Sequence, residues 1–337
     1  MTRKRRGSGE TRWLLRWLRI VERLEPAPRP RRGHPDEYPS VAMMKAFFVM
    51  TVKKIKRAQG IWNYLDNNRL IRQACGFGAK LPHCRTFQRR FQRMADEMGD
   101  WMQRATEEAI RKGYVTARVA AADKSLHAAR GPLWHQKHRR QNRVPKKLRR
   151  VDRDSQWGYS PYHKFVQGYA EHVIINATPG EARFPFDAMA DTAKMAENQV
   201  LRERLAYLPK PTRKILIDGS YDDNDLLGDL QGRRVQPILP ECAFHKGTPK
   251  LPFRRWAADL RRKKVNQRLY KRRRHVIEPH FGLDKRRFEN HVVWFYGLAN
   301  NRTHLPLVSF VIQVLMLDNF ARGRPPEEIQ WLLDAAA

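Results

Sequence analysis

The sequence is 337 residues long and strongly basic, with 67 lysine and arginine residues against 34 aspartate and glutamate residues and a formal net charge of +33. Like charges at this density oppose a compact chain unless a polyanion neutralises them, so nucleic acid is the first expected partner and an anionic membrane surface the second. A hydrophobic content of 41% and an aromatic content of 10% exclude a fully disordered basic tail. The length indicates two or three domains.

The cysteine content indicates a reducing compartment. Cys75, Cys84 and Cys242 are too few, and odd in number, for a secreted disulfide framework. The spacing of Cys75, His83 and Cys84 does not suit a zinc site.

No segment is expected to span a membrane. The most apolar run, residues 305–317, is too short for a bilayer and contains polar residues. The arginine-rich stretch 12–23 has the composition of a mitochondrial presequence, but a basic DNA-contacting arm or helix is the favoured interpretation.

The N-terminal third is expected to be helical. Residues 1–35 form a basic arm that ends in a proline-rich linker, and residues 36–114 show helical spacing of apolar residues, with Ser40 as the first N-cap. A helix that begins near Thr86 should turn Phe87, Phe91 and Met94 inward. Its outward face should carry Arg85, Arg89, Arg90 and Arg93. A helix-turn-helix-like DNA-binding domain and an ordinary helical bundle with a solvated basic face fit this pattern equally well.

Residues 115–322 are expected to form an α/β domain with a mixed sheet, followed by a C-terminal tail at 323–337. The expected strands are 115–122, 165–176, 214–217 and 235–239, and the expected helices are 188–208, 269–288 and 305–320. Two basic runs, 137–153 and 254–274, interrupt this domain and suit the tracking of phosphates.

Three acidic residues stand out in so basic a domain. Asp123 directly follows the strand expected at 115–122, and Asp218 directly follows the strand at 214–217. Side chains at the ends of adjacent strands converge at the edge of a sheet, where active sites collect. Glu278 lies in the helix 269–288 among arginines and lysines that should keep it ionised. Three converging carboxylates suit two magnesium ions about 4 Å apart, which act on phosphodiesters.

The sequence resembles the insertion-sequence DDE transposases of the group typed by insertion-sequence families four and five. Four stretches carry the resemblance: VAAADKSLHAAR (119–130), ILIDGSYDDNDL (215–226), YKRRRHVIEPHFGLDKRRF (270–288) and PHCRTFQRRFQRM (82–94). The second and third are specific, whereas the first and fourth are weak alone. The resemblance implies an RNase H-like fold, a mixed sheet flanked by helices, with a short basic insertion near 241–268.

The third stretch departs from the family pattern at one position. The family has Tyr, two residues, Arg, three residues, Glu, six residues, Lys. Arg274, Glu278 and Lys285 keep the last two spacings, but Tyr270 is one residue too far from Arg274. Either Arg273 takes the place of Arg274 in the tyrosine spacing, or one residue has been inserted.

The resemblance implies cut-and-paste transposition of DNA. Asp123, Asp218 and Glu278 would hold two magnesium ions, with manganese as the alternative, for cleavage at terminal inverted repeats and transfer of the new 3′-hydroxyl to target DNA. The expected DNA contacts are Tyr270, Arg273, Arg274, Lys285, Trp256, Arg85, Arg89 and Arg90. Trp256 is the candidate for holding a flipped base, although stacking in the core is the favoured interpretation of this residue. A homodimer in the cytoplasm of a bacterium or archaeon is also implied.

Three other functions fit part of the pattern. A domesticated transposase acting as a DNA-binding regulator would not need the three acids. A nuclease of RNase H type would not need the N-terminal helices, and a ribosomal or RNA-packaging protein would explain the charge but not the carboxylates.

Overall fold

The computed structural model describes residues 6–28, 37–133, 138, 141, 148–160, 164–241 and 250–336. Most of the first basic run, 137–153, and Cys242 lie outside these residues, so the structure does not test what the sequence predicts for them.

The N-terminal third is helical, as the sequence predicts. Its helices are α1 (Arg6–Arg23), α2 (Ser40–Val52), α3 (Ala58–Asn67), α4 (Arg69–Cys75), α5 (Cys84–Met94) and α6 (Met98–Arg111). Helix α1 is no free arm, because Leu14, Trp17 and Val21 are fully buried and the helix packs against α2 and two C-terminal helices. The basic arm is thus anchored in the core through one apolar face.

The predicted N-cap of α2 is wrong by one residue. Pro39 occupies the N-cap position and Ser40 is the first helical residue, with no side-chain capping bond. The Ser40 hydroxyl instead donates to Glu97 Oε2 at 2.7 Å and accepts a hydrogen bond from Arg90 Nη2 at 3.1 Å. A long-range contact therefore replaces the local cap.

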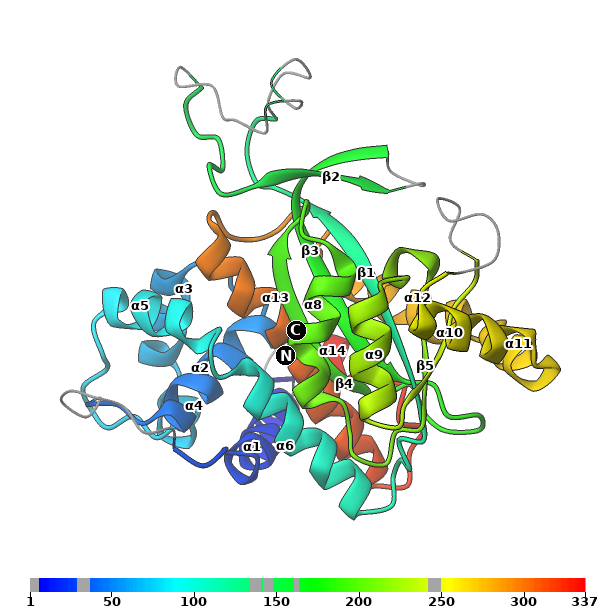
Figure 1. The fold of residues 1–337 in the computed structure, drawn as a ribbon. Coiled ribbons are helices and arrows are strands. Elements are labelled where there is room, and N and C mark those ends of the chain that lie inside the picture. The colour runs from blue at the N-terminus through cyan, green and yellow to red at the C-terminus, as the bar shows by residue number, and fades with distance from the viewer. Residues whose placement is uncertain are drawn as a thin grey trace.

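A mixed sheet follows the helices (Figure 1). Its strands are β1 (Val119–Ala128), β2 (Gln156–Ser160), β3 (Lys164–Asn176), β4 (Pro185–Thr192), β5 (Lys214–Leu216) and β6 (Gln236–Ile238). The order β4-β3-β1-β5-β6 has β3 antiparallel to β1 and β4, and β5 parallel to β1 and β6. Strand β2 pairs with the first residues of β3, along the same edge as β4. This arrangement agrees with the RNase H-like sheet that the resemblance implies.

Two expectations for the strands are wrong. Strand β1 does not end before Asp123 but continues to Ala128, because Asp123 and the five residues after it stay paired with β3. Residues 188–192 are strand, not helix, because pairing with β3 outweighs the weak helical preference of their alanines and methionine. The helix expected at 188–208 is reduced to α8 (Glu197–Arg204) and a 3-10 turn, η1 (Leu205–Tyr207).

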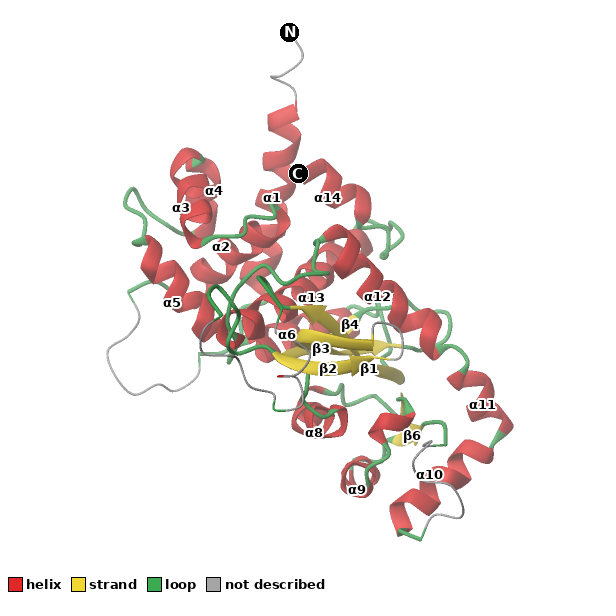
Figure 2. Cartoon of the chain, turned by 90° about the horizontal axis from the view of Figure 1, so that it is seen from above, coloured by secondary structure: helices red, strands yellow, loops and turns green. Residues whose placement is uncertain are grey.

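The sheet is covered by helices on both faces. The remaining elements are η2 (Gly219–Tyr221), α9 (Asn224–Gly232), α10 (Pro252–Arg262), α11 (Lys264–Tyr270), α12 (Arg273–Arg287), α13 (Leu298–Phe320) and α14 (Gln330–Ala336). Helices α8 and α9 lie on one face and α6 and α13 on the other (Figure 2). The helix expected at 269–288 is therefore two helices, α11 and α12, which separate at residues 271–272.

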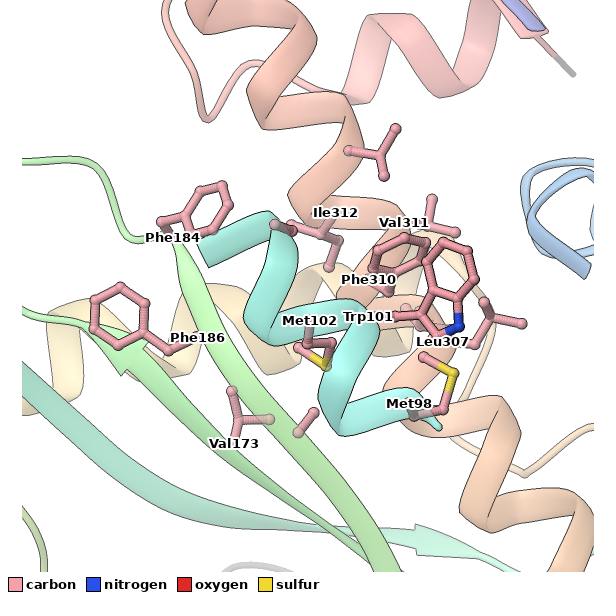
Figure 3. Close-up of a cluster of buried hydrophobic side chains, with 14 of the residues drawn as sticks. Met98, Trp101, Met102, Val173, Phe184, Phe186, Leu307, Phe310, Val311 and Ile312 are labelled. Atoms are coloured by element: carbon pink, nitrogen blue, oxygen red, sulfur yellow. The ribbon is translucent and has the colours of Figure 1, made fainter. Parts of the chain in front are cut away.

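Helix α13 joins the helical third to the sheet. Trp101 of α6 meets Phe310 of α13 edge to face, and both belong to the same buried cluster as Phe184 and Phe186 (Figure 3). Gln313 donates to Met102 O, Thr106 Oγ1 and Pro185 O, so its buried amide links α6, α13 and β4. By length and composition α13 could cross a membrane, but 94% of its apolar window is buried inside the protein. Its apolar character is explained by the core.

Candidate active site

The parallel pairing of β1 with β5 brings two of the predicted acids together. Ala121 pairs with Leu216, so Asp123 and Asp218 are each two residues beyond the same rung. Strand β1 continues past this point, whereas β5 ends and Asp218 becomes the N-cap of η2, accepting a hydrogen bond from Ser220 N at 2.7 Å. The side chain of Asp123 is 25% exposed and that of Asp218 is 38% exposed, so both carboxylates reach solvent.

A third acid, Glu197, completes the cluster. Glu197 is the first residue of α8, and one oxygen from each of Asp123, Glu197 and Asp218 lies within 4.8 Å of the others. The Ser220 hydroxyl lies within hydrogen-bond reach of both Glu197 and Asp218, and its single proton is donated to one of them at a time. Lys124 Nζ lies 2.7 Å from Glu197 Oε1. Strand β4 is parallel to β1 and β5, so α8 begins at the edge of the sheet where β5 ends.

Arg273 provides positive charge at the centre of the cluster. Its Nη2 lies 2.7 Å from Asp123 Oδ2 and 3.8 Å from Asp218 Oδ2, and the residue is only 8% exposed. Tyr270 is close enough to Arg273, Asp218 and Asp123 for each to act on its pKa, which burial raises. The structure thus brings Tyr270 and Arg273 to the carboxylates with the Tyr–Arg spacing of the family pattern.

The environment of Asp123 suits a group that binds a cation. Burial raises the pKa of Asp123 to about 6; Arg273 and the backbone N–H of Lys124 lower it in part, while Asp218 and Glu197 raise it further. Three carboxylates at short range repel one another unless protons or cations separate them. Their oxygens are the ligands that magnesium and manganese prefer, so the donor set fits hard divalent ions.

The other residues predicted from the third stretch lie elsewhere. Glu278 and Arg274 are exposed on α12, and Glu278 is about 140° around the helix axis from Arg273. Lys285 is half-buried two turns further on, where its charge acts on the buried acids Asp284 and Glu171. Trp256 is half-buried in α10.

Helix α5 carries the expected arginines, with one correction. Phe87, Phe91 and Met94 are buried, as predicted. Arg85 and Arg89 are exposed, as is Arg93. Arg90, predicted to face outward, is only 6% exposed and donates to the hydroxyl of Ser40 at the start of α2.

Sequence reasoning missed Glu197 because it placed the residue inside a single long helix, 188–208. In the structure β4 ends at Thr192 and a separate helix, α8, begins at Glu197, which is the acid in its first turn. Ser220 and Lys124 were missed because each is recognisable only through its contact with Glu197.

The sheet and its carboxylates define a mixed α/β protein with a candidate metal-dependent site of the kind that acts on phosphodiesters. The family model of the transposase DDE domain matches residues 116–315, more than half of the chain. The protein therefore belongs to the DDE transposases of insertion sequences, a family of DNA-cutting and transposition enzymes. No curated protein and no solved structure matched the chain.

Proposed function

We propose that this protein is a DNA transposase that cuts its element at the terminal inverted repeats and joins the ends to target DNA. One observation carries the proposal: Asp123, Glu197 and Asp218 converge within 4.8 Å beside Arg273, in a chain of the DDE family.

The carboxylates would hold two divalent ions, magnesium or manganese. Bound ions would lower the pKa of the attacking water or 3′-hydroxyl and stabilise the leaving oxygen of the phosphodiester. Asp123 and Asp218 are held for this task by backbone amides, since each accepts an N–H bond at Oδ1 and keeps Oδ2 toward Arg273.

Arg273 would neutralise the acids before DNA arrives and bind a phosphate near the scissile bond afterwards. A guanidinium has several donors in one plane, so it can keep a contact with Asp123 while it binds phosphate oxygens. Tyr270, next to it, would orient that phosphate through its hydroxyl. Such positioning and charge stabilisation supply most of the rate in phosphoryl chemistry.

The third carboxylate has two candidates. Glu197 is supported by geometry, since its oxygen already lies with those of Asp123 and Asp218. Glu278 is supported by its spacing to Arg274 and Lys285, which is that of the family pattern. In the structure Glu278 is exposed, so it would need a change in α12 to join the cluster. We therefore favour Glu197 as the ligand when DNA is absent.

DNA would be bound by basic surfaces on both sides of the site. Arg85 and Arg89 of α5 would contact the inverted repeat, and the basic helices α10 and α11 would follow the phosphates nearer the cleft. Arg274 and Lys285 would bind phosphates, and Trp256 would stack on a base exposed at the cut end. Two ends must be joined, so we propose a homodimer in the active complex, acting in the cytoplasm of a bacterium or archaeon.

The decisive experiment uses a supercoiled plasmid that carries the repeats flanking the gene. With magnesium, the purified chain should cut at the repeat ends, and Asp218→Asn should abolish cutting. Asparagine can still accept the Ser220 N–H bond, so the fold of η2 is kept while the charge is lost. Binding of the repeats without cutting would instead support a regulator, and cutting of RNA alone would contradict the proposal.

A further inference from the structure

A second group of ionisable side chains lies in the core, on the same strand as Asp123. His127 of β1, Glu171 of β3 and Asp284 of α12 are fully buried, and one ligand atom from each lies within 4.8 Å of the others. Successive side chains alternate across a strand, so His127 is on the same face of β1 as Asp123, about 13 Å further along. The catalytic proposal uses none of these three residues.

Each of the three side chains has one polar atom held and another without a partner. His127 Nδ1 is 2.7 Å from Asn290 O, Ser309 Oγ donates to Glu171 Oε1 at 3.1 Å, and Asn290 Nδ2 donates to Asp284 Oδ1 at 2.5 Å. The remaining atoms, His127 Nε2, Glu171 Oε2 and Asp284 Oδ2, are buried and have no hydrogen-bond partner among the described residues. Native cores rarely leave buried polar atoms in this state.

The bond from Nδ1 to a carbonyl decides which nitrogen of His127 carries the proton. A carbonyl oxygen only accepts, so Nδ1 donates and Nε2 keeps a free lone pair. A histidine that binds a metal usually holds its other nitrogen in such a bond, to a backbone carbonyl or a carboxylate. Nε2 of His127 is therefore unprotonated and available to bind a metal ion.

The distances between the three side chains are too long for hydrogen bonds from protonated acids to join them. Burial raises the pKa of Asp284 to about 7 and that of Glu171 to about 8, so two protonated acids are the rival arrangement. However, Glu171 Oε2 is 3.7 Å from His127 Nε2, and Asp284 Oδ2 is 3.6 Å from the nearer ring nitrogen, Nδ1. Hydrogen bonds require about 3.2 Å or less, so neither contact is one. Two ligands at about 2.1 Å from a shared ion stand roughly as far apart as Glu171 Oε2 and His127 Nε2. The contact of Asp284 Oδ2 with Nδ1, the nitrogen that carries the proton, shows only that this carboxylate oxygen lies beside the imidazole without a hydrogen bond to it.

We propose that His127, Glu171 and Asp284 bind one divalent transition-metal ion in the core, separate from the ions of the active site. One imidazole and two carboxylates suit zinc, and their two negative charges balance the ion in a place where a lone charge is costly. The ion would tie β1 and β3 to α12. Because Asp123 is on β1 and Arg273 is at the start of α12, the ion would hold the two sides of the active site in register.

The test uses the full chain with Asp123→Asn and Asp218→Asn, which disables the active-site cluster as a competing site. After chelation and dialysis, this protein is loaded with Zn²⁺, passed over a desalting column and analysed by mass spectrometry for metal. We expect about one zinc per chain, and a visible Co²⁺ spectrum after cobalt loading. Glu171→Gln in the same background should bind neither ion. Asp187→Asn is the matched control, since Asp187 is also a buried acid of the sheet but is paired with Arg204.

A second variant guards against misfolding of Glu171→Gln. Ser309→Ala removes the hydroxyl that donates to Glu171 and also contacts His280 Nε2, leaves the three ligands in place, and should lower zinc affinity by about tenfold in a folded chain. Zinc should also raise the melting temperature of the background chain but not that of Asp284→Asn. The proposal is overturned if the folded background chain retains no zinc, or if Glu171→Gln and Asp284→Asn both retain as much as Asp187→Asn. Either result leaves the proposed transposase activity untouched, since that is measured separately by DNA cutting.

Discussion

The choice between Glu197 and Glu278 can be made with two matched substitutions. Glu197→Gln removes a charge from the cluster with Asp123 and Asp218, whereas Glu278→Gln changes an exposed residue on α12. We expect Glu197→Gln to lower the rate of DNA cutting by about 10²-fold or more, as for loss of a group that stabilises transition-state charge. Rates would be measured on the inverted-repeat plasmid at saturating magnesium.

Manganese provides the control for this pair of variants. If Glu197 is a ligand, manganese, which binds nitrogen and oxygen donors more tightly, should restore part of the activity of Glu197→Gln. Full activity in Glu197→Gln together with loss in Glu278→Gln would show instead that α12 moves on DNA binding and that the family spacing identifies the ligand.

Asp123 should make magnesium binding depend on pH. Its pKa in the folded, metal-free protein is about 6, above the ordinary value of 3.8, chiefly because of burial. Because folding raises this pKa, the protonated carboxyl stabilises the folded chain fully at pH values below the unfolded pKa of 3.8. This stabilisation is lost as the pH rises through the folded pKa of about 6. The free energy of unfolding of the metal-free chain should therefore fall by about 2 kcal/mol between pH 4 and pH 7 because of this group. Magnesium should restore that stability only above pH 6, where the carboxylate is ionised and can bind the ion.

Thermal melts with and without magnesium measure this effect. The rise in melting temperature on adding magnesium should be large at pH 7.5 and small at pH 5, and Asp123→Asn should show no such difference. An equal rise at both pH values in the wild-type chain would contradict the prediction.

At the scale of elements, α5 carries exposed arginines that we propose to bind DNA and one buried arginine that supports the fold. Arg89 is exposed, whereas Arg90 is buried and bonded to Ser40 at the start of α2. Arg89→Ala should weaken binding of the inverted repeat and reduce the salt dependence of binding by about one phosphate contact, with no change in melting temperature. Arg90→Ala should lower the free energy of unfolding by about 1–3 kcal/mol, because it leaves buried polar atoms unpaired.

Binding isotherms at several salt concentrations, recorded without magnesium to prevent cutting, would measure both variants. An unchanged affinity in Arg89→Ala, and also in Arg85→Ala, would assign α5 to an ordinary solvated surface instead of a DNA contact.

The sequence predicts those elements whose own pattern is strong. Strand β3 and helices α5 and α13 follow from long apolar periods, and Asp218 follows from the short strand that ends just before it. Asp123 stands out at an expected strand end, but β1 continues through it to Ala128. Strand β4 could not be predicted, because its alanines and methionine favour a helix until β3 supplies a partner. Glu197 and the group around His127 depend on contacts between distant segments, so no local spacing reveals them.

At the scale of the whole molecule, the N-terminal helices and the sheet share one hydrophobic core. Residues of α2, α5 and α6 belong to the same buried cluster as residues of β1, β3 and α13. Helix α13 also bonds to both parts: Thr303 Oγ1 donates to Phe91 O at 2.6 Å, and Gln313 reaches α6 and β4. If the N-terminal helices bind the inverted repeat, as we propose, this shared core would couple the position of the bound repeat to the carboxylate cluster.

A shared core predicts that the chain unfolds in one step. Phe310→Ala removes a fully buried ring between α6 and α13, and should lower the free energy of unfolding by about 3–5 kcal/mol. Because the ring supports both parts, tryptophan fluorescence and far-ultraviolet circular dichroism should shift together in denaturant. Leu70→Ala, at a leucine that is 63% exposed, should change stability by less than about 0.5 kcal/mol. Two separate transitions, with only the later one moved by Phe310→Ala, would mean that residues 36–114 fold as an independent domain.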